Sequence, residues 1–362
     1  MCGQHGTADE LLAVHEAADV AEELLGPLLR DVVTKALDLG SAKGFDRAVA
    51  LLAGKLRGAA GPVDADAVRA AIEVLDVDWS ATTAPQRSRL LAEATTAARR
   101  ATAIVPARIQ SPFDEAATSV IEATRSEARR GQGLAIAADL NAIDRRIAQH
   151  ITSSQANFVR DQYGRRAVAF GEQARRIVAD GLEQGLGRDD LAAALERAAR
   201  AAFIERQPFY WEVVAGAFVG QGRSFAQMSS YAEAGISRYR IEAVLDERTT
   251  PMCQFLHGKE FSVGDALRRF EQVEQLQRPE DVKGALPWVR LRLDQETGRQ
   301  QLYVNGASGQ AVIADVTRSA AGTRDDRGEF RAFASNAELM DLGVSFPPYH
   351  GLCRTNVVPV IT

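Results

Sequence analysis

The first two hundred residues carry apolar side chains at the three- and four-residue spacing of an α-helix with one buried face. A row of leucines and valines predicts a first helix over 24–37. A second helix is expected to begin near Asp46 and to break at 58–62, where two glycines are followed by a proline. Asp64 is then placed to cap the helix that follows.

Further helices follow from the same spacing and from the residues at their ends. Ser111, with a proline next to it and an acid three residues later, is a typical helix start. His150 lies beside an apolar stripe, and we interpret it as a histidine at the helix surface or its boundary rather than a metal ligand. The expected segments are 85–103, 111–130, a stretch from 134 to the glycines at 185–187, a helix opening at Asp189, and 209–234.

The pattern changes near Ile236, where short runs of alternating, β-favouring residues begin. The predicted strands are 238–245, 259–263, a hairpin over 289–304 that turns at 296–298, 311–316 and 357–361. Pro359 confines the last strand to a sheet edge, because proline has no N–H to donate. The polar segment 319–329 is expected to be a mobile loop.

These patterns predict an α+β fold. An extended all-helical N-terminal half is followed by a small mixed α/β C-terminal domain with an inserted β-hairpin. We divide the chain into a helical region at 1–110, a helical lead-in at 111–205 and a C-terminal domain at 206–362, with the insertion at about 264–335.

The chain has 362 residues and a net charge of −5, with its basic and acidic residues interspersed, so no basic stripe for duplex DNA is visible. A local basic patch at Arg125, Arg129 and Arg130 is the alternative, but we interpret these residues as part of a solvated helix face. No apolar run is long enough to span a membrane and no secretory signal is visible, so we expect a soluble protein without membrane contact. Three cysteines indicate a reducing compartment or a metal site rather than a disulfide framework.

Cysteine and histidine gather in two short segments about a hundred residues apart. Cys253 precedes His257 by four residues, and His350 precedes Cys353 by three. Two thiols and two imidazoles are the ligands of a closed tetrahedral zinc site, and they predict a structural zinc ion here. Buried cysteines that pack as small hydrophobes, with the histidines in polar networks, are the alternative, and a catalytic thiolate–imidazole pair is a third.

A second group of polar residues, Asp246, Arg248 and Thr249, follows a predicted strand. We interpret it as a structural turn in which the carboxylate pairs with the guanidinium and Thr249 caps the turn. Segments typical of nucleotide, dinucleotide, zincin and α/β-hydrolase sites are missing from the sequence.

From about 174 to the end, the chain resembles the phage head morphogenesis family, the Mu F-like minor head proteins. The resemblance rests on Asp246, Arg248 and Thr249, on Cys253 and Gly258, and on the closing motif of Pro348, His350, Cys353 and Arg354 before a last strand. Family members commonly have cysteines where this chain has Thr250 and Thr355, and the joint absence of both is expected if the two positions form a pair.

The resemblance implies a protein without enzymatic activity that acts in viral assembly. A minor capsid protein of a phage or prophage would associate with the portal protein and capsid components, enter the head during assembly, and reside in the virion after passing through the host cytoplasm. A role in DNA packaging or ejection, with non-specific DNA contact, belongs to the same expectation. The alternative is a toxin or effector that carries a Mu F-like delivery module.

Overall fold

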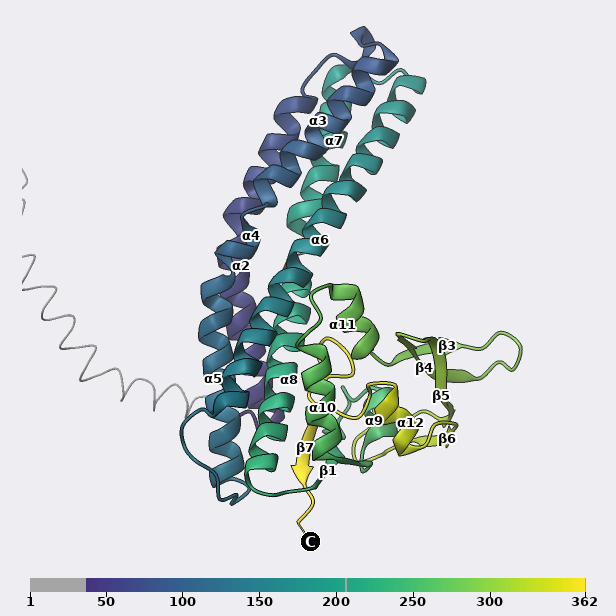
Figure 1. Ribbon diagram of the computed structural model, residues 1–362. Coiled ribbons are helices and arrows are strands. Elements are labelled where there is room, and N and C mark those ends of the chain that lie inside the picture. Colours follow the sequence, from purple (N-terminus) through teal and green to yellow (C-terminus); the bar gives the residue numbers. More distant parts are fainter. Residues whose placement is uncertain (1–36, 206, 362) are drawn as a thin grey trace, which may run out of the picture.

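The computed structural model describes residues 37–205 and 207–361. Within these residues a long helical bundle stands on a smaller unit of two antiparallel sheets and short helices (Figure 1). The predicted α+β class, with its helical N-terminal half, is confirmed. The helix predicted over 24–37 lies outside the described residues apart from its last position.

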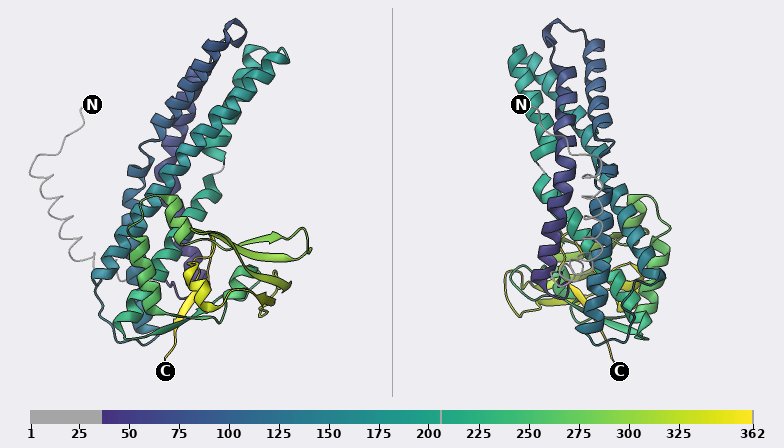
Figure 2. Two further views of the ribbon diagram at one scale, coloured as in Figure 1. Left: turned by 45° about the vertical axis from the view of Figure 1, so that its right-hand side comes forward. Right: turned by 90° about the vertical axis from the view of Figure 1, so that its left-hand side faces the viewer.

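Long helices run up and down beside one another in the bundle, as two further views also show (Figure 2). At about 1.5 Å per residue, the 42 residues of α6 span about 60 Å, nearly the full length of the bundle. The helices of this half are α2 (Ala42–Leu75), α3 (Ala84–Thr102), α4 (Val105–Arg108), α5 (Gln110–Arg130), α6 (Ala142–Glu183), α7 (Arg188–Arg200) and α8 (Gln207–Glu233).

The predicted break at 58–62 is wrong, because α2 continues through Pro62 without interruption. A proline inside a helix removes one backbone hydrogen bond, but Ala60, Val63 and Ala67 on the same turns are fully or almost fully buried against neighbouring helices. Tertiary packing therefore outweighs the local helix-breaking signal. Asp64 is not a cap but a buried mid-helix residue that accepts a hydrogen bond from the Tyr163 hydroxyl at 3.2 Å.

Three other helix predictions need correction. Ser111 does not cap α5, which begins at Gln110 directly after α4. His150 is 6% exposed and lies edge-on to the rings of Phe225 and Phe270, so it is a core residue and not a surface one. Arg125 belongs neither to a solvated helix face nor to a basic surface patch, because it is buried and forms ion pairs with carboxylates of α6 and α8.

The C-terminal part holds two sheets of different position and size. The first has the order β2-β1-β7 and is antiparallel throughout, so β7 lies at an edge, where Pro359 was expected to place it. Its strands are β1 (Arg238–Glu242), β2 (Glu260–Ser262) and β7 (Asn356–Pro359).

The predicted hairpin is part of a larger sheet with the order β3-β4-β5-β6, which projects from the side of the molecule (Figure 1). The extra strand β6 begins inside the segment predicted as a loop. This sheet consists of β3 (Arg290–Leu293), β4 (Gln300–Gly306), β5 (Gly309–Arg318) and β6 (Glu329–Ala332). Short helices connect the strands of this part: α9 (Pro251–Leu256), α10 (Val263–Val273), α11 (Pro279–Ala285) and α12 (Asn336–Asp341).

The buried apolar side chains of the described residues form two hydrophobic cores. One fills the far end of the bundle between α2, α3, α6 and α7. The other runs without a gap from the base of the bundle into both sheets, so α8 shares one core with the strands that follow it. None of the helices in 37–205 and 207–361 has the length and apolar character needed to cross a membrane.

Candidate metal centre

The candidate site is formed by two segments that are far apart in the sequence and lie side by side in the structure. The chain leaves β1, passes a loop at 243–250 that contains the polar turn of Asp246, Arg248 and Thr249, and enters α9. Thr250 is the N-cap residue of α9, and Pro251 occupies its first turn. Cys253 lies on this short helix. The closing segment 347–355 lies beside it and leads into β7, which pairs with β1.

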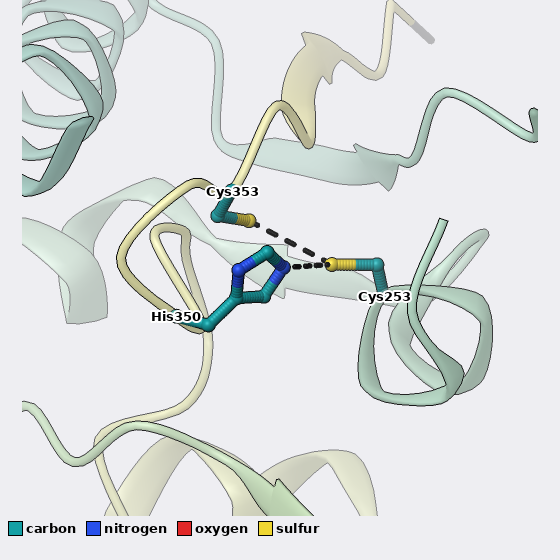
Figure 3. A group of neighbouring side chains, drawn as sticks. All are labelled: Cys253, His350 and Cys353. Atoms are coloured by element: carbon teal, nitrogen blue, oxygen red, sulfur yellow. Dashed lines mark hydrogen bonds between the residues drawn. The ribbon is translucent and has the colours of Figure 1, made fainter. Parts of the chain in front are cut away.

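Cys253, His350 and Cys353 converge inside the protein (Figure 3). The Cys253 sulfur lies 3.3 Å from Nε2 of His350 and 3.7 Å from the sulfur of Cys353. All three potential ligand atoms lie within 4.8 Å of one another. Both cysteines are buried free thiols, and His350 is half-buried. The sequence-based expectation that the two segments meet is therefore borne out for these three side chains.

The pKa values of the two thiols are shifted in opposite directions. Burial raises the pKa of the Cys353 thiol, but hydrogen bonds from Cys253 and His350 outweigh burial and hold the pKa of Cys353 well below its usual range. The hydrogen bond with Cys353 raises the pKa of Cys253, and burial acts in the same direction. The two neighbouring thiols are therefore expected to lose their protons in separate steps, Cys353 before Cys253.

Two threonines complete the surroundings of the Cys253 sulfur. The hydroxyls of Thr250 and Thr355 both hydrogen-bond to this sulfur, and the Thr250 oxygen lies 3.3 Å from Nε2 of His350. These are the two positions where the family resemblance leads us to expect cysteines. They lie against the same atom, so the sequence-based pairing of the two positions is compatible with the geometry.

His257, the predicted fourth ligand, is not part of this group. Its Nδ1 atom accepts a hydrogen bond from the Ala243 N–H at 3.0 Å, which ties the end of α9 to the end of β1. The four-residue spacing from Cys253 does not bring both side chains to one point, because α9 ends at Leu256 and His257 follows in an extended conformation. Of the four predicted zinc ligands, the structure brings three together within residues 37–205 and 207–361.

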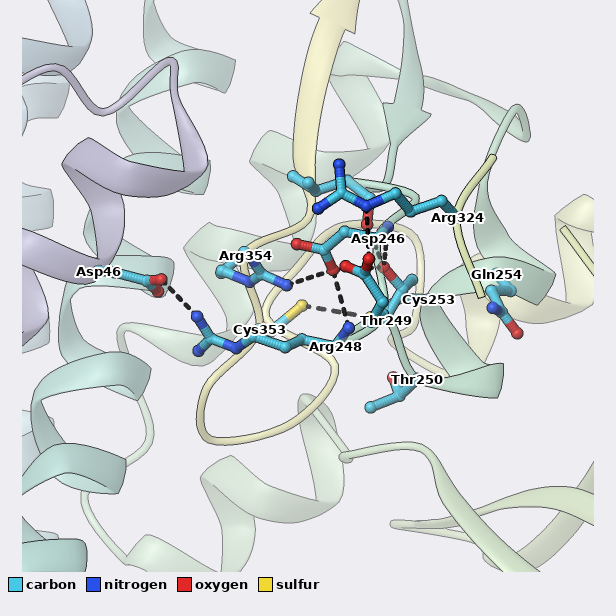
Figure 4. A network of polar contacts seen from close by, with 12 residues as sticks. Asp46, Asp246, Arg248, Thr249, Thr250, Cys253, Gln254, Arg324, Cys353 and Arg354 are labelled. Atoms are coloured by element: carbon cyan, nitrogen blue, oxygen red, sulfur yellow. Dashed lines mark hydrogen bonds and ion pairs between the residues drawn. The ribbon is translucent and has the colours of Figure 1, made fainter. Parts of the chain in front are cut away.

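The polar turn next to the cysteines is held by an ion pair between the two segments (Figure 4). Arg354 donates to the carboxylate of Asp246 at 2.6 Å, and this hydrogen bond lowers the pKa of Asp246 to about 2. The sequence predicted Arg248 as the partner, but Arg248 bonds to this carboxylate only through its backbone N–H and reaches Asp46 on α2 with its side chain, at 2.7 Å. Thr249 caps the turn by accepting from the Asp246 N–H at 2.9 Å.

One face of α8 fixes the closing segment, and the sequence did not reveal it. A Cβ on Gly216 would lie 2.1 Å from the carbonyl oxygen of Gly351, so only glycine allows the segment to pass this close. One turn further on, a Cβ on Gly220 would lie 3.1 Å from the Cβ of Pro348, a tight contact with a side chain rather than an overlap with the backbone.

Arg223 continues this face toward β7. Its guanidinium is 1% exposed and donates to the carbonyl oxygens of Leu39, at 3.1 Å, and of Arg354 and Thr355. Gln227 and Tyr231 then bond to Asn356 and Val357. The available signal was the four-residue spacing of Arg223, Gln227 and Tyr231, which places them on one face of the helix.

The three ligands fit zinc by their chemistry. Two thiol sulfurs and one imidazole nitrogen are donors that zinc prefers, and they can occupy three corners of a tetrahedron. The surrounding hydroxyls and the buried Arg223 supply polar groups that such a site needs around its ligands. The residues are therefore compatible with a structural zinc ion that links segments about a hundred residues apart.

The chain matches no family model, no curated protein and no solved structure with which it was compared.

Proposed function

We propose that this protein is a minor head protein of a phage or prophage, which associates with the portal and enters the capsid during assembly. The observation that carries the proposal is the meeting of the two motif segments: Asp246 pairs with Arg354, and Cys253 contacts His350 and Cys353. The residues that make this chain resemble the Mu F-like proteins are thus the ones that close its C-terminal unit.

The chemistry of this cluster supports a structural rather than a catalytic role. Both sulfurs are buried, and the residues around them join β1, α8, α9 and β7. We infer that Cys253, His350 and Cys353 hold a zinc ion that supplies folding energy by linking the two segments. The fourth coordination position would be taken by a ligand outside this set, since His257 lies elsewhere.

The shape of the molecule also supports a role in assembly. A bundle that extends well beyond the compact C-terminal unit offers a long surface for partner subunits (Figure 1). In the proposed role, portal and capsid proteins would be the partners, and the virion would be the final location.

Co-expression with the portal protein of the same phage or prophage tests the proposal. We expect the two proteins to co-purify at low salt and to elute together in size-exclusion chromatography. Mass spectrometry of purified virions should then detect this chain at low copy number. Two separate species at low salt, together with virions that lack the chain, would contradict the proposed function.

A further inference from the structure

Strand β3 forms an open edge of the larger sheet, which projects from the side of the molecule (Figure 1). The Asp294 N–H donates across the hairpin to the carbonyl of Arg299 at 2.8 Å. Because hydrogen-bonded and non-hydrogen-bonded pairs alternate along an antiparallel ladder, the backbone groups of Leu291 and Leu293 point away from β4. Within residues 37–205 and 207–361, no partner is recorded for these outward groups.

The edges of the other sheet are covered by side chains from neighbouring helices. At the β7 edge, the Tyr231 hydroxyl of α8 donates to the carbonyl of Val357 at 3.0 Å. At the β2 edge, the side chain of Asn336 on α12 donates to the carbonyl of Glu260 at 3.1 Å. Outward backbone groups of that sheet are therefore satisfied within the chain, in contrast to those of β3.

The two faces of β3 differ in their chemistry. Leu291 and Leu293 lie on one face, and their side chains are 38% and 55% exposed. Arg290 and Arg292 lie on the other face, because side chains alternate along a strand. The Arg292 guanidinium donates to the side-chain oxygen of Gln301 at 3.1 and 3.3 Å. In the described part of the chain, neither guanidinium has a carboxylate recorded as its ion-pair partner.

The opposite edge of the same sheet has its charges paired. On β6, Glu329 forms an ion pair with Arg318 at 3.0 Å, and Arg331 forms one with Asp315 at 2.7 Å. The arginines of β3 are thus the ones on the edges of this sheet whose charge is open to an acidic partner.

The chemistry of β3 disfavours a second copy of the same strand at this edge. In a new antiparallel ladder the outward backbone groups must face one another, so the leucines would lie opposite the leucines of the other copy. The alternation of side chains then places arginine opposite arginine on the other face. Like charges directly opposite each other destabilise a strand pair, so the edge favours a partner of complementary charge.

We propose that β3 binds an extended segment of a partner protein in which acidic and apolar residues alternate. The segment joins the larger sheet as an added strand, and its backbone pairs with Leu291 and Leu293. Its acidic side chains lie opposite Arg290 and Arg292, and its apolar side chains cover the exposed leucines. The inference does not depend on the proposed role in the phage head.

A blocked synthetic peptide of alternating glutamate and valine tests this edge on the full chain. Fluorescence anisotropy of the labelled peptide measures the affinity, and hydrogen exchange identifies the amides that become protected. We expect saturable binding below millimolar peptide and protection of the amides of Leu291 and Leu293. Methylation of the valine nitrogens, which face β3, should abolish binding, whereas methylation of the glutamate nitrogens, which face away, should preserve it.

Two substitutions in β3 test the backbone and the charge separately. Leu293→Pro removes an outward N–H, leaves the ladder with β4 in place, and should weaken binding about tenfold. Arg290→Glu should weaken binding of the glutamate–valine peptide about tenfold and strengthen binding of a lysine–valine peptide by about the same factor. Arg175→Glu, the same change at an exposed position of α6, is the matched control and should leave both affinities unchanged.

Each outcome decides the proposal. Weaker binding by Leu293→Pro, together with the reversed charge preference of Arg290→Glu, supports it. No saturation by the glutamate–valine peptide at millimolar concentration overturns it, and so does equal affinity of the parent protein for the lysine–valine peptide. Dimers of the parent protein that dissociate in Leu293→Pro would identify a second copy as the occupant of this edge and would overturn it as well.

Discussion

Replacing Gly216 by alanine tests whether the close packing of α8 against the closing segment stabilises this protein. The added Cβ would lie 2.1 Å from the carbonyl oxygen of Gly351, roughly 1 Å inside ordinary contact distance. The obstructing atom belongs to the backbone, so it cannot rotate away as a flexible side chain would. Either α8 or the segment next to His350 and Cys353 must move.

The expected change in the free energy of unfolding is the sum of two opposing effects. Overpacking a closely packed position costs about 1–3 kcal/mol, and the backbone contact places this position at the upper end. Alanine is favoured over glycine inside a helix by about 1 kcal/mol. The free energy of unfolding should therefore fall by about 2 kcal/mol in the Gly216→Ala variant.

Gly54 in α2 provides a matched control, at which the same substitution should change the free energy of unfolding in the opposite direction. It is an exposed glycine inside a helix, and a Cβ at its position would meet nothing within 4 Å. The same substitution there should raise the free energy of unfolding by about 1 kcal/mol, because only the helix preference changes.

Urea unfolding followed by circular dichroism measures both variants against the parent protein, and metal analysis reports their zinc content. We expect Gly216→Ala to lower both stability and zinc content, since the shifted segment carries two of the three ligands. A Gly216→Ala variant as stable as Gly54→Ala, with unchanged zinc content, would refute the reasoning about α8.

Three further predictions concern the cluster and the buried ionisable groups. If the proposed zinc ion is bound, chelators should lower the unfolding temperature of the parent protein, whereas Cys353→Ser should bind no zinc and have an unfolding temperature insensitive to chelators. Asp246→Asn should lower the free energy of unfolding by about 2 kcal/mol at pH 7 in urea titrations. The difference between variant and parent should vanish as the pH falls through the usual carboxyl range toward the folded pKa of about 2. At that pH, protonation of Asp246 breaks the ion pair in the parent protein too. Burial lowers the pKa of His150 to about 4, so the unfolded state gains a proton between about pH 6.5 and 4 that the folded state does not. Stability should therefore fall by about 3 kcal/mol across that window, and a His150→Leu variant with the same pH slope as the parent would contradict this.

Local patterns were sufficient wherever the neighbouring residues alone decide the structure. The helix at 85–103 and the hairpin over 289–304 were predicted closely, because apolar spacing and turn residues lie within one element. The predicted edge position of the last strand was also correct, since proline cannot donate to a neighbouring strand. Where distant packing competes with a local signal, as at Pro62, the prediction failed.

For the candidate site, the sequence by itself determined the residue types and the two segments that carry them. Only the tertiary structure decided which members meet: His350 reaches Cys253 and Cys353, His257 turns to the backbone of Ala243, and Arg354 replaces Arg248 as the partner of Asp246. The physical reason is that spacing fixes directions within one helix or strand, whereas contacts over a hundred residues depend on how separate elements pack. Here that packing is set by one face of α8.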